Sequence, residues 1–310
     1  MISIERFEGQ MIYPMKSGKR YPMIHAFHIL LELTKFKISL FAALSTFTGF
    51  ILAHQELSGE IIFPVMGVFL LACGSCALNQ YQEREDDRRM ERTKDRPIPS
   101  GKLRPHTALL ISIGLILSGS LILFYGTNLM AWGLGLFAMV WYNGVYTYLK
   151  RKSAFAAIPG ALVGSIPPLV GWISWKGHLS FDPQILAVAF FFFMWQVPHF
   201  WLLLLNFGKD YERAGFPSLT RIFSSAQLGR MTFMWIFGTA MTCMMIPLYG
   251  VVESPVIRVG LFAAAFWLMW KDSGLLKVRS PEFSLPFTFN NINSFALMVM
   301  ALITLDTLFY

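Results

Sequence analysis

The sequence has few charged residues and few cysteines, and both shortages limit the kind of protein it can encode. Charged residues make up 14% of the 310 positions and hydrophobic residues 55%, a balance typical of membrane proteins rather than water-soluble domains. The three cysteines cannot form an even disulfide framework. Cys73 and Cys76 have CxxC spacing, but no further thiol or imidazole lies within their apolar run. This spacing therefore favours close helix packing over a metal or redox site.

The first part of the chain lacks an apolar core. No apolar run begins before about residue 38, and Glu5 and Glu8 are unusual in targeting peptides. We therefore expect neither a secretory signal nor a transit peptide. The predicted organisation is a cytoplasmic N-terminal segment, 1–37, followed by a single transmembrane domain, 38–310.

Acidic residues are also scarce, which leaves a net charge of +8. The basic residues lie between apolar runs rather than along one soluble face. Their distribution favours anionic lipid or an anionic substrate over nucleic acid as the partner.

The apolar runs predict an all-α, polytopic membrane protein with about nine transmembrane helices around a central cavity. The predicted spans are 38–54, 60–80, 105–124, 128–148, 155–175, 184–206, 231–250, 256–271 and 287–308. With these spans, all of the 26 lysines and arginines except Lys176 and Arg258 lie on the side of the membrane that holds the N-terminus. The positive-inside rule places that side in the cytoplasm, and an odd number of spans leaves Tyr310 outside. Long loops after spans two and six suggest a four-helix pseudo-repeat.

The stretch 79–101 carries the densest charge and predicts a diphosphate site. Asn79, Glu83 and Asp87 are spaced i, i+4, i+8, so one helix face would present oxygen ligands for Mg²⁺. We expect Pro97 to end this helix and Asp86 to pair with an arginine. The alternative is a solvated helix end with interleaved salt bridges.

Basic residues surround these acids and could clamp an anion with several phosphate oxygens. We expect those on the acid-bearing face to bind diphosphate, and Arg84 and Arg89 to serve topology and lipid contacts. The candidates in this stretch are Arg88, Arg92 and Arg96. At the end of span four, Lys150 and Arg151 are either topology determinants or further ligands of the leaving group.

Span six contains polar residues inside an apolar run, at Trp195, Gln196 and His199, beside Pro198. Proline removes a helix hydrogen bond, so we expect a kink there and a cavity that the imidazole and amide face. The histidine is either a helix-to-helix hydrogen bond or a ligand.

Asn206 and Asp210 follow at i, i+4 in the same span. They predict a second ligand group that faces the first, as a diphosphate bridged through Mg²⁺ requires. The alternative is a charged helix terminus. The predicted metal ligands are then Asn79, Glu83, Asp87, Asn206 and Asp210, of which all except Asn206 are also predicted to be catalytic.

These motifs resemble the intramembrane aromatic prenyltransferase superfamily, and within it the family of protoheme IX farnesyltransferases, also called haem O synthases. The first motif is similar to Asn-x3-acid-x3-Asp followed by MxRTxxRP and Gly, with Met90, Arg92, Thr93, Arg96, Pro97 and Gly101 at the later positions. The second is similar to WQxPHF with a downstream DYxxAGxP, at 195–200 and 210–217. YTYLKR at 146–151 and GSIPPLVGW at 164–172 also match. The resemblance covers about 33–308.

The resemblance implies transfer of a farnesyl group from farnesyl diphosphate to a vinyl group of haem b, with water added, which gives haem O and diphosphate. It implies Mg²⁺ as cofactor and a multi-pass protein of a bacterial inner membrane. His199, Gln196, Trp195 and Tyr146 are the expected acceptor-binding residues, with a base role for His199 as an alternative. A haem A synthase or an oxidase-assembly protein is an implied partner of the basic loops.

Three positions depart from the family pattern, at Phe36, Glu83 and the loop 217–224. The loop leaves open a prenyltransferase that acts on a quinone precursor or a chlorin. A secondary transporter is the alternative from another class, but it would place its polar residues at the bilayer centre rather than at one face.

Overall fold

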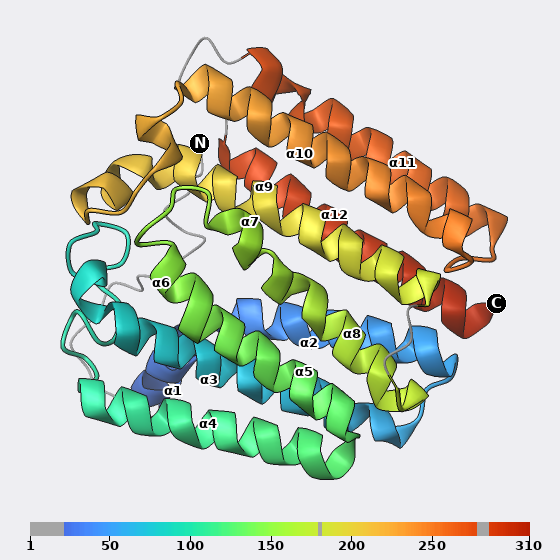
Figure 1. Ribbon diagram of the computed structural model, residues 1–310, viewed down its shortest axis with the longest axis horizontal. Helices are drawn as coiled ribbons and strands as arrows, with labels where there is room; N and C mark the ends of the chain where they lie inside the picture. Colours follow the sequence, from blue (N-terminus) through green and yellow to red (C-terminus); the bar gives the residue numbers. More distant parts are fainter. Residues whose placement is uncertain (1–21, 179–181, 278–284) are drawn as a thin grey trace.

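The computed structural model describes residues 22–178, 182–277 and 285–310, and every regular element in these ranges is a helix (Figure 1). Most of the predicted N-terminal segment, 1–21, lies outside the described residues. In Figure 1 the long helices lie side by side, with α10 and α11 along one edge and α4 along the opposite edge. The all-α prediction is confirmed.

Each predicted span coincides with a helix or a helical run. These are α2 (Phe36–His54), α3 (Ile62–Asp87), α4 (Pro105–Gly126), α5 (Leu129–Val140) with η3 (Trp141–Tyr146) and α6 (Thr147–Leu149), α7 (Ala157–Gly160) with α8 (Leu162–Lys176), α9 (Pro183–Arg213), α10 (Ser225–Met245), α11 (Pro255–Asp272) and α12 (Leu285–Phe309). The remaining elements are α1 (Pro22–Leu33) and the short turns η2 (Gly59–Ile61), η4 (Leu219–Arg221), η5 (Ile246–Tyr249) and η6 (Ser273–Lys277).

Among the described residues, seven helices are long and apolar enough to cross a membrane. The two other predicted spans are weaker candidates for membrane-crossing helices, for different reasons. The run from Leu129 to Leu149 is divided by a π-helical segment, η3. Helix α11 carries Arg258, Lys271 and Asp272 among its 18 residues. Both nonetheless pack in the bundle, where α11 contacts α10 and α12.

Glycines allow two helix pairs to pack closely. A β-carbon at Gly49 of α2 would lie 2.0 Å from the Pro168 carbonyl oxygen of α8. One at Gly119 of α4 would lie 2.6 Å from the Leu71 backbone nitrogen of α3. Small residues at helix interfaces are the usual way for membrane helices to gain packing contacts.

Helix α9 keeps helical backbone dihedral angles through Pro198, where the sequence predicts a kink. Proline still removes the donor that would pair with the Met194 carbonyl, and the Thr239 hydroxyl of α10 donates to that oxygen at 3.0 Å. The neighbouring helix thus replaces the missing bond. The non-helical residue in α9 is instead Phe207, with φ −119° and ψ 17°.

Helix α3 ends at Asp87 rather than at Pro97, and residues 88–104 run as turns. The predicted helical face therefore stops before Arg88. This stretch, the end of α6 and the loop after α9 lie at the same end of the bundle (Figure 1). We call this the charged end. At the opposite end, the buried Asp306 of α12 accepts from the backbone nitrogens of Glu253 and Ser254, at 2.8 and 3.0 Å, before α11 begins.

Candidate active site

The last turns of α3 present a buried row of polar side chains at the charged end, Asn79, Glu83 and Asp87, which we call the acidic row. Asn79, Glu83 and Asp87 are all buried, with exposed fractions of 1%, 4% and 0%. Asn79 Nδ2 donates to Glu83 Oε1 at 2.7 Å, so these side chains lie on one helix face as the spacing predicts. Buried carboxylates are stable only when cations or donors compensate them.

Three cations from other parts of the chain provide that compensation. Lys35 Nζ donates to Asn79 Oδ1 at 3.0 Å, Lys150 pairs with Glu83, and Arg96 Nη1 lies 2.9 Å from Asp87 Oδ1. Lys35 has a left-handed backbone, φ 46°, at the start of α2. Burial, and then the nearby Arg96 charge, lower the pKa of Lys35 below its ordinary value.

The π-helical segment η3 directs Lys150 toward Glu83. In a π-turn the chain adds a residue per turn, and such turns are frequent at functional sites. Thr147 Oγ1 donates to the Tyr142 carbonyl at 2.9 Å and accepts from Asn79 Nδ2 at 3.2 Å. Asn143 Nδ2 donates to the Ser75 carbonyl at 3.0 Å, which ties η3 to α3.

The end of α9 meets the turns after α3. Asp210 Oδ2 accepts from the Arg92 backbone nitrogen at 3.2 Å, and an Arg92 Nη2 donates to the Tyr211 hydroxyl at 3.4 Å. Met90 packs in one buried cluster with Ala214 and Phe216. Both predicted polar motifs thus lie in contact at the charged end.

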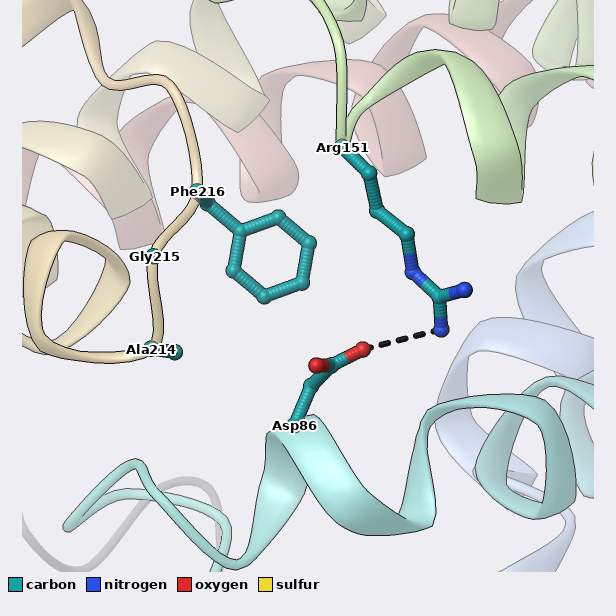
Figure 2. A pocket seen from close by; sticks show the side chains of 5 residues that line it. All are labelled: Asp86, Arg151, Ala214, Gly215 and Phe216. Carbon is teal, nitrogen blue, oxygen red and sulfur yellow. Dashed lines mark hydrogen bonds and ion pairs between the residues drawn. The ribbon is translucent and has the colours of Figure 1, made fainter.

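A pocket of about 160 Å³ opens between these motifs, lined by Asp86, Arg151, Ala214, Gly215 and Phe216 (Figure 2). Arg151 Nη2 lies 2.8 Å from Asp86 Oδ2 across it. The predicted pairing of Asp86 with an arginine is confirmed. The same contact holds Arg151 at the pocket wall rather than against Glu83.

Two further predicted site residues, Arg88 and Asn206, also lie away from the acidic row. Arg88 lies past the end of the helix and pairs with the exposed Glu85 at 3.0 Å. Asn206 is exposed, because the irregular backbone at Phe207 interrupts the i, i+4 relation to Asp210.

Aromatic rings connect the acidic row to His199. The Tyr146 ring lies 5.7 Å from Lys150 Nζ and 5.8 Å from the Phe200 ring. Phe200 in turn lies 5.7 Å from the His199 ring. The two predicted regions, one for an anion and one for an acceptor, are therefore joined by direct contacts.

Trp195 and Gln196 lie on the same helix as His199 and have different partners from each other. Trp195 stacks on Phe41 of α2 at 4.6 Å and donates from Nε1 to the Ile292 carbonyl at 3.0 Å. Gln196 lies against Gly164, where a β-carbon would come within 1.9 Å of Oε1. Its Oε1 is buried and has no hydrogen-bond partner among the residues that the structure describes.

Sequence reasoning missed three polar residues in this region: Lys35, Thr147 and Asn293. Asn293 Oδ1 lies 2.9 Å from His199 Nδ1. Asn293 stands in the predicted ninth span, where a polar side chain is itself a sign of function. Lys35 immediately precedes the first span, but its sequence neighbours do not indicate that it pairs with Asn79.

The oxygen donors at the charged end suit Mg²⁺. Among the described residues, no three carboxylate, imidazole or thiol groups lie together as a metal site. Mg²⁺ commonly binds through one or two carboxylates and completes its shell with substrate phosphates and water. Ammonium and guanidinium groups already contact Asn79, Glu83 and Asp87, so these oxygens accommodate positive charge.

The sequence and fold are similar to those of known prenyltransferases. Residues 42–292 match the UbiA prenyltransferase family. Protoheme IX farnesyltransferase of Geobacter sulfurreducens is 35% identical over 270 residues, which cover 86% of this chain and 95% of that protein.

Two solved structures share the fold at 14% identity. A digeranylgeranylglyceryl phosphate synthase superposes with a TM-score of 0.69, over 91% of this chain and 98% of that one. A UbiA homologue from Archaeoglobus fulgidus, bound to DMAPP and Mg²⁺, superposes with a TM-score of 0.67, over 90% of this chain and 98% of that one.

Proposed function

The chain belongs to the UbiA prenyltransferase family and is a prenyltransferase, and we propose that it transfers a farnesyl group from farnesyl diphosphate to a vinyl group of haem b. Water is added in the reaction, and the products are haem O and diphosphate. The observation that carries this proposal is the chain of ring contacts from Lys150 to His199. It joins an anion site to an imidazole, and the Geobacter sulfurreducens relative is a protoheme IX farnesyltransferase by name.

Positive charge at the charged end stabilises the leaving diphosphate. Lys150 and Arg96 contact the acidic row and Arg92 lies against the end of α9. All three gain phosphate oxygens as partners when substrate binds. Arg151 faces the adjoining pocket. Asn79, Glu83, Asp87 and Asp210 would hold Mg²⁺, which neutralises diphosphate charge when bound.

Cleavage of the carbon–oxygen bond leaves the electron pair on diphosphate and an allylic cation on the farnesyl chain. The Tyr146 and Phe200 rings lie between the two regions and can stabilise that cation through their faces. Phe191 and Phe192 are buried in the core and Phe190 is 53% exposed. Phe191 and Phe192 therefore contribute packing, and Phe190 lies at the outer surface of the bundle.

The vinyl π electrons of haem b then form the new carbon–carbon bond. The cation that results beside the porphyrin ring takes up water and releases one proton. His199 binds the porphyrin, and Trp195 packs beside it at 5.0 Å between ring centroids. The buried Oε1 of Gln196 provides an acceptor on the same helix.

The proposal includes a location and partners. The seven apolar helices make the chain an integral multi-pass membrane protein. We place it in a bacterial inner membrane with the charged end in the cytoplasm, because the basic loops gather there. A haem A synthase or an oxidase-assembly protein would receive the product at those loops.

A substrate comparison tests the proposal. Purified protein with Mg²⁺ and farnesyl diphosphate is given either haem b or a hydroxybenzoate, and products are identified by mass spectrometry. We expect a farnesylated, hydrated haem from the first mixture and no product from the second. Prenylated hydroxybenzoate without haem O would refute the assignment.

A further inference from the structure

His199 contacts two side chains of α12, Asn293 and Phe289, and Asn293 provides a polar partner for its ring. The Asn293 Oδ1 lies 2.9 Å from His199 Nδ1, although the residues are 94 positions apart. The contact joins α9 to α12 at the level of the Trp195 indole, whose Nε1 donates to the Ile292 carbonyl at 3.0 Å. Consecutive residues of α12 thus hold two rings of α9.

This contact determines which imidazole nitrogen has the lone pair. An amide oxygen only accepts hydrogen bonds, so Nδ1 of a neutral imidazole must carry the proton. The lone pair is then on Nε2, the nitrogen on the other side of the ring. A metal-binding histidine typically has its other nitrogen held in this way by an acceptor.

The ring also has a fixed plane. Phe289 lies 4.6 Å from His199 between ring centroids, and Trp195 lies 5.0 Å from it. These contacts limit rotation of the imidazole, while the Asn293 oxygen fixes its direction. The environment therefore favours one orientation and one tautomer.

On this basis we propose that Asn293 is a positioning residue that holds His199 as the Nδ1–H tautomer and presents Nε2 to the iron of haem b. The inference rests on the proposed function, because that function provides the haem. A contact that only joins two helices would stabilise the fold without changing how haem binds.

The test measures haem binding to the full-length purified protein. Ferric haem b is titrated into wild type, Asn293→Leu, Asn293→Asp and His199→Ala, and the Soret band gives the dissociation constant. The Fe–His stretch of the ferrous complex, from resonance Raman, reports the ligand. Asn290→Leu is the matched control, because Asn290 lies on the same helix and is exposed.

Loss of an acceptor beside a metal-binding histidine lowers affinity by roughly 10- to 100-fold. We expect Asn293→Leu to weaken haem binding by about tenfold or more and to shift or broaden the Fe–His band. Asn293→Asp retains an acceptor oxygen and should recover affinity, with the band at higher frequency. Asn290→Leu should match wild type.

The outcomes separate this inference from the proposed function. If His199→Ala loses the Fe–His band and Asn293→Leu matches Asn290→Leu in affinity and spectrum, Asn293 has no positioning role and the haem contact still stands. If His199→Ala retains the wild-type band, the haem contact of His199 and this inference both fail. A thermal melt of each variant shows whether lost binding reflects a lost fold. If Asn293→Leu is unfolded, the decision rests on Asn293→Asp, and a folded Asp variant with tenfold weaker binding would overturn the inference.

Discussion

Lys150→Met should destabilise the metal-free protein and make its stability depend on Mg²⁺. Lys150 pairs with Glu83, which is 5% exposed at its side chain. Methionine retains the length of the side chain but not its charge. Glu83 would then be a buried carboxylate with weaker compensation, from Asn79 and the more distant Lys35.

The size of the effect follows from the burial of the pair. Removing one partner of a buried ion pair destabilises a protein by about 3–5 kcal/mol. We expect about 3 kcal/mol, the lower end of that range, because Asn79 Nδ2 still donates to Glu83. Unfolding entropy of about 2.1 cal/mol/K per residue gives about 0.65 kcal/mol/K for this chain, so the melting temperature should fall by about 5 °C.

Mg²⁺ should reverse much of this loss. A ligand at 100 times its dissociation constant stabilises the folded state by about 2.7 kcal/mol, or about 4 °C here. The wild-type protein should gain less, because Lys150 must first leave Glu83. The assay is thermal unfolding in detergent, with EDTA and then with excess Mg²⁺.

Two variants control the measurement. Lys152→Met removes an exposed lysine two residues away and should melt like wild type. Glu83→Gln combined with Lys150→Met removes both charges and should recover most of the lost stability. If Lys150→Met melts within about 1 °C of Lys152→Met in EDTA, where about 5 °C is expected, the ion pair does not support the fold and the reasoning is wrong.

Three further predictions concern the same region. Asp87→Asn should lower farnesyl transfer by about 100-fold or more while the protein stays folded; wild-type turnover with Mg²⁺ would contradict its role. Gly164→Ala should displace Gln196 and lower transfer, whereas Gly133→Ala, where a β-carbon would meet nothing within 4 Å, should not; equal rates would remove the packing argument. The lowered pKa of Lys35 means that its charged form opposes folding at neutral pH. As the pH rises from that lowered pKa toward 10.5, the folded protein releases this proton before the unfolded chain does. The melting temperature of the metal-free protein should therefore rise over this pH range in wild type and rise less in Lys35→Met. Identical pH profiles for the two proteins would refute this role of Lys35.

Hydropathy predicted the positions of the helices well because a membrane span must be long, apolar and hydrogen-bonded within itself. It could not predict where α3 ends. Proline at 97 marks the last position a helix could reach, but the chain turns at Asp87, where Arg96 returns to bind that carboxylate. A contact across the turn determined the boundary, and local sequence does not encode it.

The candidate site was predictable where its residues share one helix and unpredictable where they meet across helices. Spacing alone placed Asn79 and Glu83 side by side. No local pattern indicates that Lys35 lies against Asn79, or that Asn293 lies against His199, because those pairs depend on how α2, α3, α9 and α12 pack. The error at Asn206 is of the opposite kind. Its i, i+4 spacing predicts a position beside Asp210, but the irregular backbone at Phe207 interrupts the helix between them.

The π-helical segment η3 has a consequence for the rotational phase of the fourth span. An α-helix turns by about 100° per residue, so one additional residue in a turn rotates everything beyond it relative to everything before it. Helix α5 can thus pack against α8 in one orientation while Thr147 and Lys150 face α3 in another. Deleting a single residue within 141–146 would shorten the span by only one residue and leave it apolar, and it would still turn Lys150 away from Glu83.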